Sequence, residues 1–154
     1  MGTVERLLRD ASWTVAEMSD DYDRSVGFLR FRKPVLGPEE TDGYHRLVQV
    51  LWAYDIEGAD TMPDAHTSDE MGRFENHLCA AVEHDLQAVL TAVLTFDGAR
   101  QWVFYTRDVP EFGRRLSTMP DFHGNPYPIE LTTREDPAWS YLRDVILGPV
   151  LPEQ

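Results

Sequence analysis

The chain has 154 residues, of which 42% are hydrophobic and 27% charged, and Cys79 is its single cysteine. This length allows a well-packed domain, the 11% of aromatic residues excludes a disordered chain, and no run approaches the ~20 apolar residues of a membrane-spanning helix. We therefore expect one domain over residues 1–154, with a core at 12–147 and peripheral segments at 1–11 and 148–154. The lack of an apolar signal region at the start and the lone thiol predict a cytoplasmic location.

The formal net charge is −13, and most of it lies in the middle of the chain. Residues 55–100 contain two basic and ten acidic groups, and so carry −8 of the total. Such a field repels nucleic-acid phosphates and anionic membranes, whereas it attracts a basic protein. The same charge is also compatible with a role in solubility alone.

The first part of the chain predicts a helical turn, a hairpin and a strand. The turn covers residues 3–9, and the hairpin joins Trp13–Met18 to Val26–Arg32 through a polar turn. Pro and Gly residues mark 33–43 as a loop. His45–Tyr54 carries apolar residues on both faces, which predicts a central strand.

A long amphipathic helix is predicted to begin at Thr67. Thr67 and Glu70 fit a capping box, in which each side chain satisfies a free backbone amide near the helix start. The apolar residues recur at helical spacing and form one core-facing stripe. This stripe consists of Met71, Phe74, Leu78, Ala81 and Val82.

The second half predicts a hairpin, a short helix, a strand and a last helix. Val89–Phe96 and Arg100–Thr106 flank an Asp-Gly turn, and Asp108 caps a short helix with Pro in its first turn. Tyr127–Thr133 alternates as a half-buried strand, and Asp136-Pro137 begins the last helix. The buried face of that helix is formed by Trp139, Leu142 and Ile146.

This order of elements predicts an α+β fold. Residues 45–133 follow the split βαβ pattern of ferredoxin-like sandwiches, and right-handed crossovers place both helices on one side of an antiparallel sheet. The added N-terminal β-hairpin extends or flanks that sheet, and the C-terminal helix covers an edge or an end.

Several motifs together resemble a known bacterial family. An acidic loop with Pro63 leads into the long helix, the strand at 102–108 reads WVFYTRD, residues 135–141 read EDPAWSY, and Trp13 opens the first strand. The combination resembles domain of unknown function 695 over residues 12–147. That family implies no catalytic residues, substrate or cofactor. At fold level, the chain is also similar to the regulator of ribonuclease E activity B, an acidic inhibitor that binds its target enzyme.

The long helix carries two groups of metal-ligating side chains, but neither predicts a metal site. Seven-residue steps separate Glu70, His77 and His84. Because seven residues rise roughly 10.5 Å along a helix, these three cannot share one ion. Glu75, Cys79 and Glu83 have the useful spacing of four, yet Cys79 is expected to pack as a small core residue. We therefore expect no metal and no cofactor.

Two alternative functions remain open. No nucleophile or phosphate-binding motif is present, so an enzyme would need a site built from the loop-end residues His45, His66 and His123 and nearby carboxylates. An RNA-binding sheet would use the strand aromatics Trp52, Tyr54, Trp102, Phe104 and Tyr105. The acidic charge disfavours nucleic acid, and packing in the core explains the same aromatics.

The acidic loop at 55–66 is the remaining candidate, because a loop of this length in a compact domain is often functional. Its candidate partner-binding residues are Asp55, Glu57, Asp60 and Asp64. The spacing does not fit a calcium loop. We expect a non-enzymatic protein-interaction or regulatory domain whose acidic face binds a basic protein, with a simple solvated crossover as the alternative.

Overall fold

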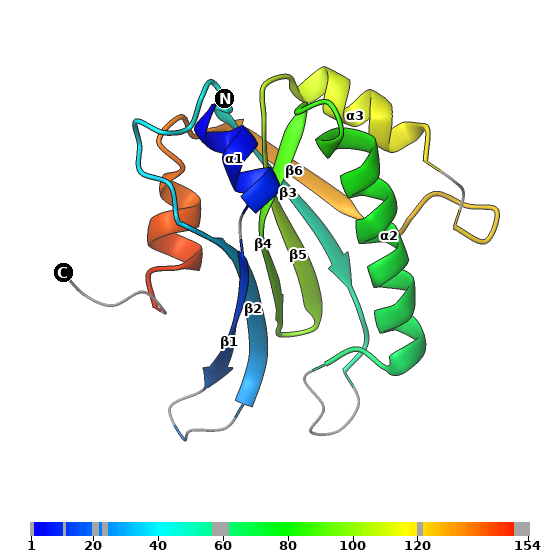
Figure 1. Ribbon diagram of the computed structural model, residues 1–154. Coiled ribbons are helices and arrows are strands. Elements are labelled where there is room, and N and C mark those ends of the chain that lie inside the picture. Colours follow the sequence, from blue (N-terminus) through cyan, green and yellow to red (C-terminus); the bar gives the residue numbers. More distant parts are fainter. Residues whose placement is uncertain are drawn as a thin grey trace.

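The computed structural model describes residues 2–10, 12–19, 22, 25–56, 62–119 and 122–149 (Figure 1). The elements in chain order are α1 (Thr3–Asp10), β1 (Ser12–Ser19), β2 (Ser25–Lys33), β3 (Arg46–Ala53), α2 (Ala65–Glu83), β4 (Ala88–Phe96), β5 (Ala99–Thr106), α3 (Val109–Ser117), β6 (Glu130–Glu135) and the π-helix η1 (Tyr141–Ile146).

Within the described residues, six strands form one sheet in the order β1-β2-β4-β5-β3-β6, and every neighbouring pair is antiparallel. The expected α+β class is therefore confirmed, whereas the finer ferredoxin-like assignment stays a prediction. The N-terminal hairpin extends the sheet beyond β4. Thr91 forms a bulge in β4, and its hydroxyl donates to the Val103 carbonyl at 2.8 Å.

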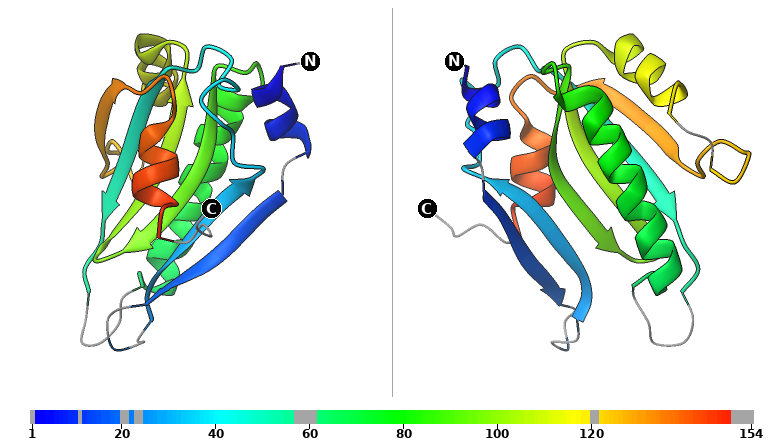
Figure 2. Two further views of the ribbon diagram at one scale, coloured as in Figure 1. Left: turned by 90° about the vertical axis from the view of Figure 1, so that its left-hand side faces the viewer. Right: turned by 45° about the vertical axis from the view of Figure 1, so that its right-hand side comes forward.

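One face of the sheet is covered by α2 and α3 (Figures 1 and 2). The predicted stripe of α2 is buried there at all positions except Ala81, which is half-buried. This layer has a strongly aromatic core because three large rings meet at its centre. Their packing is edge-to-face or tilted, with centroid distances of 5.1–6.4 Å among Trp52, Phe74 and Trp102.

The opposite face is covered by α1 and the C-terminal segment. The last helix therefore packs on a face of the sheet, and the expectation that it covers an edge or an end is wrong. The physical reason is that the central strands are apolar on both sides. Leu47, Val103 and Tyr105 are fully buried on this second face, and Trp139 and Leu142 cover them.

The C-terminal segment departs from the sequence prediction, because its helix begins at Tyr141 and not at Pro137. Asp136 still acts as a cap: Oδ1 accepts from the Ser140 amide and Oδ2 from the Tyr141 amide, both at 2.9 Å. Trp139 adopts a left-handed backbone with φ 58° and stacks on Tyr105 with a centroid distance of 4.5 Å. This stacking holds the residues before Tyr141 outside the helix.

The predicted strand at 127–133 is also displaced, since β6 covers Glu130–Glu135. Tyr127 and Ile129 lie in the irregular segment before it, where they pack against the aromatic layer. The alternation arises because Tyr127 and Ile129 both pack against the aromatic layer, although the segment is not a strand.

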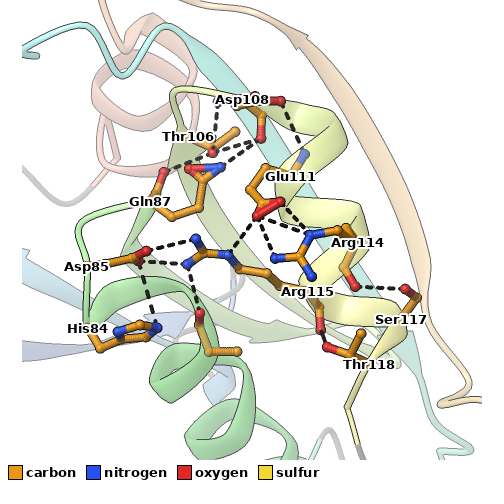
Figure 3. Close-up of polar contacts among 11 residues, drawn as sticks. His84, Asp85, Gln87, Thr106, Asp108, Glu111, Arg114, Arg115, Ser117 and Thr118 are labelled. Carbon is orange, nitrogen blue, oxygen red and sulfur yellow. Dashed lines mark hydrogen bonds and ion pairs between the residues drawn. The ribbon is translucent and has the colours of Figure 1, made fainter.

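A polar network joins the C-terminal end of α2 to α3 (Figure 3). The Arg115 guanidinium donates to both carboxylate oxygens of Asp85, at 2.6 and 2.8 Å, and to the Ala81 carbonyl at 3.1 Å. It also contacts Glu111 at 3.2 Å. The hydrogen bonds from Arg115 lower the pKa of Asp85 to about 2. This network fixes α3 over the sheet.

Candidate functional site

Several of the residues predicted to be functional lie where β3 ends and α2 begins. A cavity of about 380 Å³ lies there, which we call the β3-end cavity. It is lined by Trp52, Ala53, Tyr54, Asp55, Met62, Asp64, Thr67, Glu70, Phe122 and Pro128.

Aromatic rings form one side of the β3-end cavity. Trp52 is 4% exposed and packs edge-on against Phe122, with a centroid distance of 5.4 Å. Phe122 and Tyr54 are half-buried, and burial raises the pKa of Tyr54. The guanidinium of Arg100 lies near Tyr54 and partly offsets this rise, while its Nε donates to Thr95 Oγ1 at 2.8 Å.

Carboxylates form the other side. Asp55 is exposed at the end of the strand, and Asp64 is the N-cap of α2. Its Oδ1 accepts from the Thr67 amide at 2.7 Å, which lowers the pKa of Asp64. The prediction that Thr67 caps this helix is therefore wrong: Asp64, three residues earlier, supplies the cap oxygen, and the helix starts at Ala65.

Two of the four predicted partner-binding residues thus line the same cavity, namely Asp55 and Asp64. Glu57 and Asp60 lie outside the described residues. Glu70 is the third carboxylate of the cavity, and sequence reasoning assigned it to the capping box.

Glu70 also brings together two of the three loop-end histidines. His66 Nε2 lies 3.1 Å from Oε1 of Glu70, and His123 Nε2 lies 2.7 Å from Oε2. The carboxylate is well covered, with 13% of the side chain exposed, whereas the imidazoles are 79% and 68% exposed. His45 does not join them, because it precedes β3 and so lies at the opposite end of that strand.

The second group considered as metal ligands, Glu75, Cys79 and Glu83, is engaged within the protein. Glu75 accepts from the Trp102 indole at 2.9 Å and pairs with Arg30 at 2.5 Å. Glu83 accepts from the Leu90 amide at 2.9 Å, and burial raises the pKa of the Cys79 thiol. Within the described ranges, no group of three or more His, Cys, Asp or Glu residues is placed to hold a metal ion.

The strand aromatics of the RNA alternative lie mainly inside the protein. Trp102, Phe104 and Tyr105 have no exposed surface, and Trp52 has only 4%. Stacking a base requires a free ring face, which these four side chains do not offer. Only Tyr54 of the set is partly accessible.

The meeting of His123 with Glu70 was missed at the sequence level. The two residues are 53 positions apart, so no local periodicity connects them. The position of Phe122 beside Trp52 was missed for the same reason. The only local signal was the Trp-Ala-Tyr-Asp run at the end of the strand, which places aromatic and acidic groups close together.

The fold and site define an acidic α+β domain with an aromatic and carboxylate-lined cavity at one end of its sheet. The chain belongs to the family of unknown function DUF695, whose model matches residues 12–147. Neither a curated protein nor a solved structure matches the chain. In the part of the chain that the structure describes, no helix is long and apolar enough to cross a membrane.

Proposed function

We propose that this domain binds a basic protein, and that one Lys or Arg side chain of the partner enters the β3-end cavity. One observation carries the proposal: three carboxylates and three aromatic side chains line this cavity together. An aliphatic stem with a cationic head matches such a lining, because the stem contacts rings while the head meets carboxylates.

Charge supports a cationic partner on a larger scale. The whole chain carries −13, and the segment that contains the cavity residues Asp55, Asp64 and Glu70 carries −8 of it. Such a field accelerates the encounter with a basic surface, and the effect weakens as salt is added. Arg100 is not part of the lining, and its single positive charge near Tyr54 is outnumbered by the three carboxylates that line the cavity.

A second candidate function is acid–base catalysis, favoured by the convergence of His66 and His123 on Glu70. A carboxylate that orients an imidazole is a recurrent element of general-base sites. Its weakness here is exposure: imidazoles that are 68% and 79% exposed remain solvated, and a solvated dyad gains little from its carboxylate. Binding is therefore the better-supported function.

Calorimetric titration with hexa-arginine tests the binding proposal. Asp55→Asn, Asp64→Asn and Glu70→Gln each remove one cavity charge, and Asn at position 64 retains a capping oxygen. We expect each to weaken binding by about 2–5-fold, the range of a solvent-accessible ion pair. Glu39→Gln is the matched control, because Glu39 is exposed in the loop before β3 and outside the cavity lining.

The Glu39→Gln control distinguishes binding at the cavity from a general attraction of the peptide to the negative charge of the protein. If Glu39→Gln weakens binding as much as the cavity variants do, the peptide responds to net charge alone and the proposal fails. Catalysis has a separate readout, hydrolysis of p-nitrophenyl acetate. A rate above background that His66→Ala and His123→Ala both abolish would favour the enzyme reading.

A further inference from the structure

The sheet has an open edge at β6, far from the other edge at β1. All six residues of β6 are exposed, and Leu131 has 43% of its surface accessible. The strand pairs with β3 on one side, and no described strand pairs with its other side. Figure 2 shows β6 as the outermost strand of the sheet. An open edge is a template for another strand.

The ladder between β3 and β6 shows which backbone groups are free. One position beyond the Arg46–Glu135 pair, the Asp136 amide donates to the His45 carbonyl at 2.7 Å. The direction of the backbone N–H and C=O groups alternates along an antiparallel strand. The backbone groups of the even-numbered residues of β6 therefore point toward β3. The amides and carbonyls of Leu131, Thr133 and Glu135 therefore point outward.

The charge pattern of the edge is self-complementary. Glu130, Thr132 and Arg134 share one face of β6 because side chains alternate along a strand. If two copies pair antiparallel about Thr132, Glu130 lies opposite Arg134 of the partner subunit, and the reverse pair forms by symmetry. In the same register, Leu131 lies opposite Thr133 of the partner subunit, so the outward backbone groups pair with each other.

Two neighbouring registers would also pair the outward-pointing backbone groups of the two strands, but their side-chain pairs are less favourable. Centring the pair on Thr133 places Glu130 opposite Asp136 of the partner subunit, which brings like charges together. Centring it on Leu131 places Arg134 opposite Pro128 of the partner subunit, which has neither a charge nor an amide hydrogen. Backbone direction and charge thus select the same register.

An apolar groove runs along this edge. It has a volume of about 510 Å³ and lies between the end of α3 and the start of β6. Its apolar lining is formed by Leu116, Met119, Pro126, Tyr127, Ile129 and Leu131. Leu131 of the partner subunit lies on this same face in the selected register, because it opposes Thr133. In this register, apolar surface therefore lies on one face of the joined strands and the Glu130–Arg134 charge pairs lie on the other.

We propose that the protein forms a symmetric dimer in which β6 pairs with β6 of a second copy, joining two sheets into one. The dimer has a two-fold axis at Thr132, and its interface is isologous. Both copies are strongly acidic, but at physiological salt the Debye length is about 8 Å, so distant charges hardly oppose the contact.

Sedimentation velocity over a wide range of protein concentrations tests this dimer. Glu130→Arg and Arg134→Glu each turn two attractive cross-strand pairs into repulsive ones, and we expect each to weaken the dimer about tenfold. The double variant restores both pairs in reversed order and should recover dimerisation. Glu17→Arg makes the same charge change at the β1 edge and should leave the dimer intact.

Thr133→Pro provides an independent test. Its amide points outward, so proline removes no hydrogen bond within the monomer, yet it blocks the ladder between copies. Circular dichroism checks that the variant is folded. A chain that stays monomeric at every concentration would overturn the proposal. So would a dimer that survives Thr133→Pro, or one that the double charge variant fails to restore.

Discussion

The hydrogen bond between Tyr105 and Asp136 gives the most defined stability prediction. The Tyr105 hydroxyl donates to Oδ2 of Asp136 at 2.6 Å, and Tyr105 has no exposed surface. This distance is typical of a charge-assisted bond from a hydroxyl to a carboxylate. The bond connects β5 to the cap of η1, so it holds the C-terminal segment on the sheet. Tyr105→Phe removes it without changing the ring.

The expected cost of Tyr105→Phe follows from what remains after the substitution. Hydrogen bonds to charged groups contribute about 1.5–3 kcal/mol. Asp136 keeps the amides of Ser140 and Tyr141, so it is not left without partners. We therefore expect the free energy of unfolding to fall by about 2 kcal/mol. For a domain of this size, that corresponds to a drop in Tm of about 4–8 °C.

Urea denaturation at pH 7 measures this loss, and Tyr141→Phe is the matched control. The half-buried Tyr141 hydroxyl accepts from the neutral amide Nε2 of Gln101 at 2.7 Å, and the substitution keeps the ring that Arg134 contacts, so we expect a loss below about 1 kcal/mol. The reasoning is refuted if Tyr105→Phe costs no more than Tyr141→Phe.

Three further predictions concern the backbone, the cap of α2 and acid stability. Gly27→Ala should destabilise the protein by about 1–3 kcal/mol, because the new Cβ would lie 2.3 Å from a backbone carbonyl of β4. Gly72→Ala should instead stabilise it by about 0.5–1 kcal/mol, because the Cβ meets open space in the middle of α2. Thermal melts of the two variants measure both effects. Asp64→Ala should lower Tm and Asp64→Asn should largely preserve it; equal losses would contradict capping by the side-chain oxygen. Arg115→Gln should lower the free energy of unfolding above pH ~4, and the gap between variant and wild type should shrink as the pH falls toward 2. The reason is that the depressed pKa of Asp85 stabilises the fold only while that carboxyl is ionised. Urea titrations in which this gap does not change with pH would contradict the prediction.

Regular elements could be predicted because their signals are local. The stripe of α2 and the Asp-Gly turn before β5 each rest on residues within a few positions of one another, and both are present. The starts of α2 and of the last helix were predicted at the wrong residues because the sequence carries competing local signals there. Asp64 and Thr67 are both good caps, and Asp136-Pro137 has the composition of a helix start. Stacking of Trp139 on Tyr105, a contact across 34 positions, overrode the second signal.

The candidate site could be predicted only in part. Asp55 and Asp64 flank an acidic loop, so the sequence indicated an acidic surface at this point. It did not indicate that Phe122 and Glu70 would enclose the same cavity, because these residues meet through folding of distant segments. The motif EDPAWSY, one of the features that carry the family resemblance, forms a buried cap and stacking network. Such a motif identifies a fold without locating a site.

Tryptophan indole signals test the central claim most directly. The chain has four tryptophans: Trp52 and Trp102 pack together in the aromatic layer, Trp139 lies on the opposite face of the sheet, and Trp13 is in β1. Only Trp52 lines the β3-end cavity. In ¹H–¹⁵N spectra during titration with hexa-arginine, we expect the Trp52 signal to shift most and to saturate, with Trp13 and Trp139 unmoved. Unchanged Trp52, or equal shifts at all four, would contradict capture of a cationic side chain in this cavity.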